Sequence, residues 1–149
     1  MSPFICREDL LAAARSFCDA FAKHKLLDEI LAYFATDNAA CLEHGLPQLA
    51  PFLGRRFTGP DGVREYFRLI ADLLSYEDMR FSDYVVDADS LKVSVKGQAK
   101  FTWNKTANSW QEVFAYMLEF DEQRKVKLYE VWADSGAAYM ASRGELSSK

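Results

Sequence analysis

Residues 103–134, WNKTANSWQEVFAYMLEFDEQRKVKLYEVWAD, decide the fold of this chain of 149 residues. Two segments rich in aromatic and aliphatic residues, 110–120 and 125–134, flank the polar stretch 121–124, which predicts a turn. The polar stretch 104–109 predicts a hairpin turn before them. We therefore expect the two segments to be strands of one antiparallel sheet, and to form most of the wall of any pocket.

The segment before these strands alternates with a period of two residues. From residue 91 to residue 103, small or apolar side chains occupy one face, and lysine, serine, glutamine and threonine occupy the other. This pattern is typical of an antiparallel strand with one buried face. Residues 79–87 predict a further strand, and residues 135–143 a short terminal helix.

The N-terminal half has the period of an amphipathic helix. Apolar stripes predict helices over residues 9–24 and 26–34, and a third over 59–75 with proline at its first helical position. Residues 39–44 predict a short strand, and residues 46–57 a loop or lid.

Segregated helices and strands favour the α+β class, with a curved antiparallel sheet that forms a cone closed by the N-terminal helices. The length, with no linker or repeat, predicts one domain over residues 1–149, with a core at about 9–142 and a flexible tail at 143–149. A curved sheet covered by helices leaves a conical cavity, the usual kind of place for a small ligand.

Composition excludes several classes of function. A net charge of −4 and a pI of about 5.2 argue against nucleic acid as a partner. No apolar run approaches the roughly 20 residues of a membrane span, and the N-terminus lacks a basic signal-peptide region. Cys6, Cys18 and Cys41 are odd in number and lack metal-ligand spacing, so we expect reduced thiols and a cytoplasmic protein. Two distant histidines predict no metal site.

Three segments resemble the SnoaL-like branch of the nuclear transport factor 2-like superfamily: FATDNAACLEHG (34–45), FLGRRFTGPDGVREYF (52–67) and KVKLYEVWADSGAAYM (125–140). The resemblance covers about residues 9–142. It implies a cone-shaped α+β barrel, often a homodimer, without organic cofactor or metal. Relatives include ketosteroid isomerase, scytalone dehydratase, limonene epoxide hydrolase and polyketide cyclases, which share a fold and no single reaction.

The chain departs from that pattern in its final strand. Many SnoaL-like sequences have an acid directly before the last aromatic pair, where this chain has Val131 beside Glu130. Residues 121–124 replace the usual Asp-Gly turn. The resemblance therefore implies no catalytic residue on this strand.

Strand alternation divides the side chains into two faces. Pairing Phe120 with Lys125 across the turn places Tyr116 opposite Tyr129, and Trp103 is paired with Trp110 across the earlier hairpin. We assign one face to the cavity: Phe101, Trp103, Trp110, Glu112, Phe114, Tyr116, Tyr129 and Val131. The other face, with Gln111, Met117, Glu119, Glu130, Trp132 and Asp134, then meets solvent or a dimer partner. A slip of one residue in register would reverse the two faces.

Glu112 is the first candidate catalytic residue. Desolvation among aromatic side chains raises the pKa of a carboxyl group and suits a general acid or base; the alternative is a solvated or paired acid at the strand end. Tyr116 and Tyr129 are candidate donors to a developing negative charge, or phenols that satisfy core acceptors. Glu43 and His44 lie near where ketosteroid isomerase-like proteins keep a carboxylate base. Neighbours in a strand face opposite ways, so we expect one of the two in the pocket.

The remaining candidates are ligand-binding residues: Arg56, Tyr66, Phe101, Trp103, Trp110, Phe114 and Tyr129. Arg56 either binds an acid of the ligand or caps the rim, and the two tryptophans either wall the ligand or pack across the hairpin. For Asp134, a role as a helix cap is as well supported by the sequence as a role as a catalytic acid.

We expect a cofactor-independent enzyme that transfers protons in the isomerisation, dehydration or cyclisation of a small hydrophobic, polyketide- or terpenoid-like molecule. The alternative is a non-catalytic ligand-binding or dimeric adaptor module. A cone filled by its own side chains, or one with every acid outside, favours the alternative.

Overall fold

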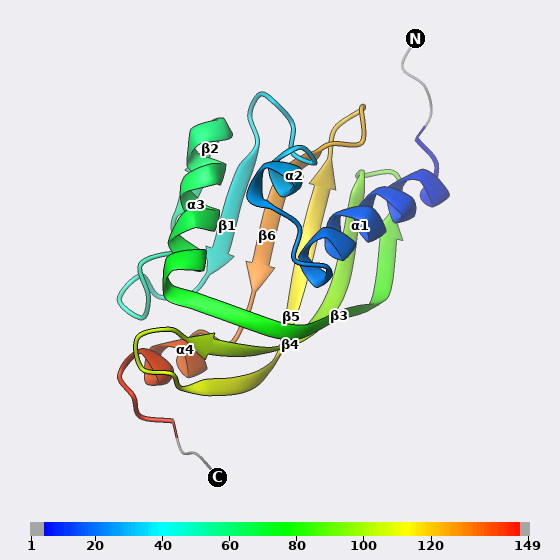
Figure 1. Cartoon of the computed structure of the whole chain (residues 1–149). Helices are drawn as coiled ribbons and strands as arrows, with labels where there is room; N and C mark the ends of the chain where they lie inside the picture. Colours follow the sequence, from blue (N-terminus) through cyan, green and yellow to red (C-terminus); the bar gives the residue numbers. More distant parts are fainter. Residues whose placement is uncertain (1–4, 147–149) are drawn as a thin grey trace.

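The computed structural model describes residues 5–146 as a curved sheet with helices across its concave face (Figure 1). The elements are α1 (Arg7–Ala22), α2 (Leu27–Leu31), β1 (Ala40–His44), β2 (Arg56–Thr58), α3 (Gly59–Leu73), β3 (Leu74–Asp87), β4 (Lys92–Trp103), β5 (Ser109–Phe120), β6 (Val126–Trp132) and α4 (Ser135–Ser142). The expected α+β class and cone-shaped sheet are confirmed.

The described strands form one six-stranded sheet in the order β2-β1-β6-β5-β4-β3. All neighbours are antiparallel except β1 and β6, which run parallel. The expectation of a wholly antiparallel sheet is therefore wrong at this pair. The segment expected to be only a loop ends in β2, which pairs with β1. The parallel pair places β1 beside β6, although more than 80 residues separate them along the chain.

The helices bury the apolar stripes that predicted them. α1 buries Leu10, Ala14, Phe17 and Phe21, and α3 buries Val63 and Tyr66. In Figure 1, α1 and α2 lie over one part of the concave face, α3 lies over β1 and β2, and α4 lies at one end of the sheet. The side chains of α1 and α3 therefore approach the same concave surface from two sides.

A glycine lets a large ring lie over the middle of β4. A Cβ atom added at Gly97 would lie 2.2 Å from Cε2 of Phe114, which is much closer than two carbon atoms can approach. Glycine in a strand often marks such a close approach. The absent side chain therefore sets the position of Phe114 on the concave face.

The predicted pairing of β5 with β6 is wrong by two residues. Tyr116 pairs with Val131, and Leu118 pairs with Tyr129. The turn is wider than expected because Oδ1 of Asp121 accepts hydrogen bonds from the backbone N–H groups of Gln123 and Lys125, both at 2.9 Å. A register irregularity between Glu119 and Phe120 accompanies this turn.

The hairpin between β4 and β5 is shifted by two residues as well. Phe101, rather than Trp103, pairs with Trp110. A shift of two residues keeps every side chain on its face, because the side-chain period of a strand is two. Within the strands themselves, both predicted faces therefore survive the errors in register.

Other features complete the description. Cys18 and Cys41 are buried free thiols, and Cys6 is an exposed one. Among residues 5–146, no helix is long and apolar enough to cross a membrane, and no three His, Cys, Asp or Glu side chains gather as a metal site would require. The N–H of Leu146 donates to Oδ1 of Asn108 at 3.1 Å, while residues 147–149 of the predicted tail lie outside the described part.

Candidate active site

A cavity of about 380 Å³ is lined by residues of the concave face of the sheet, of α3 and of the turn that joins α1 to α2. Ligand pockets typically fall in the range of about 300 to 1,000 Å³. Aromatic side chains form much of its wall: Phe21, Phe67, Phe101, Trp110, Phe114 and Tyr129. The cone is thus not filled by its own side chains.

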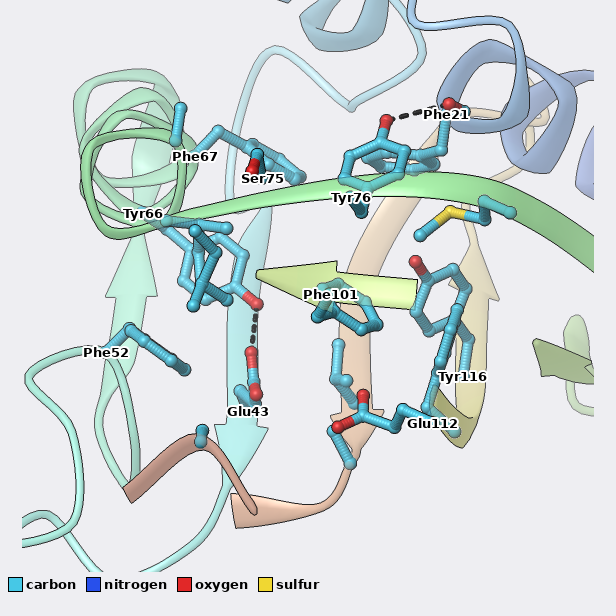
Figure 2. Close-up of a pocket in the computed structure, with 18 of the residues that line it drawn as sticks. Phe21, Glu43, Phe52, Tyr66, Phe67, Ser75, Tyr76, Phe101, Glu112 and Tyr116 are labelled. Carbon is cyan, nitrogen blue, oxygen red and sulfur yellow. Dashed lines mark hydrogen bonds between the residues drawn. The ribbon is translucent and has the colours of Figure 1, made fainter. Parts of the chain in front are cut away.

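Glu43 points into this cavity from β1 and is only 8% exposed. The hydroxyl group of Tyr66, on α3, donates a hydrogen bond of 2.5 Å to its Oε1 (Figure 2). Burial raises the pKa of Glu43 from 4.5 to about 7; the hydrogen bond from Tyr66 opposes this rise, and the negative charge of Glu112 adds to it. Glu43 therefore gains or loses a proton near neutral pH.

Glu112 lies on β5 at the same end of the cavity and is also 8% exposed (Figure 2). Its Oε1 accepts hydrogen bonds from Nε1 of Trp110 at 2.9 Å and from the backbone N–H of Asp134 at 3.3 Å. Burial raises the pKa of Glu112 to about 7, the two hydrogen bonds lower it, and the carboxylate of Asp134 raises it. The predicted desolvated carboxyl is therefore present.

The two carboxyl groups are held in the same way. In each, the hydrogen bonds to the protein involve Oε1, and within residues 5–146 Oε2 has no protein partner. No fully buried side-chain oxygen of these residues lacks a partner, so each Oε2 is accessible. One oxygen of each group is thus fixed, and the other is open to a molecule in the cavity.

Three buried tyrosines, Tyr66, Tyr116 and Tyr129, also line this space. Burial raises the pKa of each phenol well above its usual value of 10, because the phenolate form would lose its hydration. The rings of Tyr116 and Tyr129 pack edge to face, with centroids 4.8 Å apart. These phenols therefore stay neutral hydrogen-bond donors at all ordinary pH values.

Most of the predicted site residues meet in this cavity. Lining it are Glu43, Tyr66, Phe101, Trp110, Glu112, Phe114, Tyr116 and Tyr129. The cavity face of β5 and β6 is therefore correctly assigned.

Three predicted site residues do not line the cavity. His44 faces the other side of β1, where its Nε2 lies 2.6 Å from Oε2 of Glu130 and its ring stacks on Trp132. Arg56 is exposed on β2. Trp103 is buried, but the shifted hairpin carries it past the end of β5, and Phe101 takes the place opposite Trp110.

Asp134 departs from its assignment to the outer face. It lines the rim of the cavity, where its Oδ1 accepts a hydrogen bond of 2.9 Å from the N–H of Ala137 and caps α4. The sequence reading as a helix cap is therefore confirmed, while the reading as an outward-facing residue is wrong.

Apart from Tyr66, sequence reasoning missed the helical side of the cavity. Phe21, His24, Lys25, Phe67 and Arg68 line it from α1, the following turn and α3. The apolar stripes of the helices predicted that Phe21 and Phe67 are buried. Such a stripe does not show whether a buried side chain packs in the core or lines a cavity.

Comparison of sequences finds no family model and no curated protein that matches the chain. Solved structures do match. A nuclear transport factor 2-like protein of unknown function from Burkholderia pseudomallei superposes with a TM-score of 0.75 at 15% identity, over 89% of this chain and 95% of the other. A putative isomerase from Bacillus subtilis gives a TM-score of 0.73 at 15% identity, over 92% and 94% of the two chains.

A third match is the protein TerC, co-crystallised with polyporic acid, with a TM-score of 0.75 at 13% identity over 90% of this chain and 98% of that one. At such identities the likeness establishes the fold. The chain therefore has the nuclear transport factor 2-like fold, as the resemblance of its three segments implied.

Proposed function

We propose that the protein is a cofactor-independent enzyme that moves a proton within a small hydrophobic molecule. The observation that carries this proposal is the pair of buried carboxyl groups, Glu43 and Glu112, each with a pKa of about 7 and one free oxygen in the same apolar cavity. A pKa near the working pH is what general acid–base catalysis requires.

The two groups are electrostatically coupled. Hydrogen bonds stabilise the ionised form of each, from Tyr66 to Glu43 and from Trp110 and the Asp134 N–H to Glu112, while a neighbouring carboxylate opposes the ionisation of each. When Glu112 keeps its proton, it no longer repels the charge on Glu43. We therefore propose that the pair holds one proton, with Glu43 as the base and Glu112 as the acid, in the way that paired carboxyl groups divide their roles.

In the proposed reaction, Oε2 of Glu43 removes a proton from a carbon next to a carbonyl group. The protonated Oε2 of Glu112 donates a hydrogen bond or its proton to the oxygen where negative charge develops. Return of the proton from Glu43 to a second carbon gives an isomer. In a substrate with a hydroxyl group on the carbon β to the carbonyl, that hydroxyl instead leaves as water with a proton from Glu112, and the product is an unsaturated carbonyl compound. The neutral phenols of Tyr116 and Tyr129 are additional candidate donors.

A polyketide- or terpenoid-like substrate fits this cavity. Its wall is largely aromatic, and its volume is that of a pocket for a drug-sized molecule. Among the fold neighbours, one is described as a putative isomerase and another was co-crystallised with the small molecule polyporic acid, which supports isomerisation as the reaction and a small molecule as the ligand.

Deuterium exchange tests the proposal without knowledge of the true product. The protein is incubated in D₂O with a panel of bicyclic and tricyclic enones and diketones, and deuterium at the acidic carbon is measured by mass spectrometry. We expect enzyme-dependent incorporation into at least one compound, and its loss by at least about 100-fold in Glu43→Gln. Compounds that bind without exchange would instead identify a carrier.

We also propose that two copies associate through the convex face of the sheet. Val85, Val113 and Trp132 lie on strands β3, β5 and β6 and are 62%, 61% and 44% exposed. Sedimentation of the wild type and of Trp132→Glu tests this: the wild type is expected as a dimer and the variant as a monomer.

A further inference from the structure

We infer that the substrate carries an anionic group, held at the end of the cavity opposite Glu43 and Glu112. This inference rests on the proposed function and adds a requirement to it: the ligand is an amphiphilic acid rather than a neutral hydrocarbon-like molecule. It follows from how charged residues are distributed along the cavity.

The cavity has an acidic end and a basic end. Glu43, Glu112 and Asp134 are the carboxylates that line it, and they are grouped, since Glu112 acts electrostatically on Glu43 and Asp134 acts on Glu112. Lys25 and Arg68 are the lining cations. Lys25 follows His24 in the turn after α1, and Arg68 is on α3; we call these three lining residues the basic end.

Figure 2 shows this separation through the labelled neighbours of the two ends. Tyr76 and Phe21 lie on one side of the cavity, and Glu43 and Glu112 lie on the other. The ring of His24, next to Lys25, stacks on Tyr76 with centroids 4.5 Å apart. The ring of Phe67, next to Arg68, packs on Phe21 with centroids 5.7 Å apart. The neighbours of both cations therefore lie on the side of Tyr76 and Phe21. The aromatic wall separates the two ends.

The cations of the basic end lack acidic partners. Among residues 5–146, neither Lys25 nor Arg68 has a carboxylate within 4.0 Å. Both side chains are exposed. Arg64, one turn earlier on α3, pairs with Asp28 at 3.0 Å. Lys25 and Arg68 are therefore cations of the cavity lining that have no ion pair within the described residues.

This arrangement fixes the orientation of a ligand. An anionic group at Lys25 and Arg68 stays near water, the apolar body lies against the aromatic wall, and the far end of the molecule reaches Glu43 and Glu112. The reverse orientation would bring an anion beside two carboxyl groups, which disfavours it. The basic end therefore selects the substrate and aligns its reacting carbon.

Two dyes with nearly the same aromatic skeleton test the inference. Anilinonaphthalene sulfonate is an anion, and N-phenylnaphthylamine is its neutral counterpart; the Kd of each is measured by fluorescence at low salt. A unit charge about 4 Å away in a water-like medium contributes about 1 kcal/mol, which is about fivefold in Kd. We expect Lys25→Gln and Arg68→Gln each to weaken the anionic dye about fivefold and to leave the neutral dye unchanged.

The chain offers a matched control for each variant. Lys23 lies two residues before Lys25, and Arg64 one turn before Arg68, and neither lines the cavity. Lys23→Gln and Arg64→Gln make the same change in net charge, and we expect them to alter neither Kd. Ala71→Trp, at an exposed lining position on α3, should block both dyes.

Three results would overturn the inference. They are equal losses for both dyes, equal losses in the control variants, or binding of the anionic dye that survives Ala71→Trp, because the anion would then not use this end of the cavity. Glu43→Gln separates this test from that of the proposed function. It abolishes isotope exchange and leaves the preference for the anionic dye intact, so each proposal can fail alone.

Discussion

Replacing Glu43 by glutamine should change how the stability of the protein depends on pH. Folding raises the pKa of Glu43 from 4.5 to about 7. Between these values the folded protein holds a proton that the unfolded chain releases. The stability contributed by this carboxyl group is thus fully present below pH 4.5 and is lost as the pH rises through about 7.

The size of the effect follows from the change in pKa. At about 1.4 kcal/mol for each pH unit, the loss above pH 8 is about 3 kcal/mol. Glutamine has no proton to lose, and its amide oxygen can still accept the hydrogen bond from Tyr66. Relative to the wild type, Glu43→Gln should therefore gain about 3 kcal/mol between pH 5 and pH 8.5.

Urea unfolding at several values of pH between 5 and 8.5 measures this difference. We expect the two curves of unfolding free energy against pH to diverge as the pH rises from 5, to reach half of the total difference near pH 6, and to run parallel above about pH 7. Glu65→Gln, an exposed change on α3, is the control and should follow the wild type. A constant difference between wild type and Glu43→Gln over the whole range would refute the reasoning, since Glu43 would then titrate alike in both states.

Three further changes test individual contacts. Tyr66→Phe removes the donor that favours ionised Glu43, so the pKa of Glu43, followed by carboxyl NMR, and the pH at which isotope exchange sets in should both rise. Gly97→Ala should destabilise the protein by about 1–3 kcal/mol in urea unfolding, because the new Cβ meets the ring of Phe114; unchanged stability would contradict that contact. His44→Ala should leave the rate of isotope exchange unchanged. A decrease of more than about tenfold would show that His44 takes part in the reaction.

The faces of the strands could be predicted from the sequence because they depend only on a period of two. Tyr116 and Tyr129 were paired wrongly, yet both reached the cavity, since the wider turn moved the register by an even number of residues. The exact register depended on hydrogen bonds from Asp121 inside that turn, which composition does not reveal. Trp103 shows the limit of this prediction, because a shift of two residues in register decides whether a side chain lies at the cavity or beyond it.

The choice between Glu43 and His44 could not be made from sequence alone. Both end a short strand, and the face that each occupies depends on the parallel pairing of β1 with β6, a contact between distant parts of the chain. The basic end was missed for a related reason. Lys25 and Arg68 are ordinary surface residues in sequence, and only the approach of α3 to the turn after α1 brings them to one cavity.

No contact within the described part of the fold requires an ionisable side chain at Glu43 or Glu112. The ion pairs among the described residues join exposed or partly exposed groups, and none of them includes Glu43 or Glu112. A buried acid without a cation destabilises the fold above its pKa, whereas glutamine at either position could accept the same hydrogen bonds without that cost. The proposed proton transfer would account for two such acids facing one cavity, and the exchange experiment tests it.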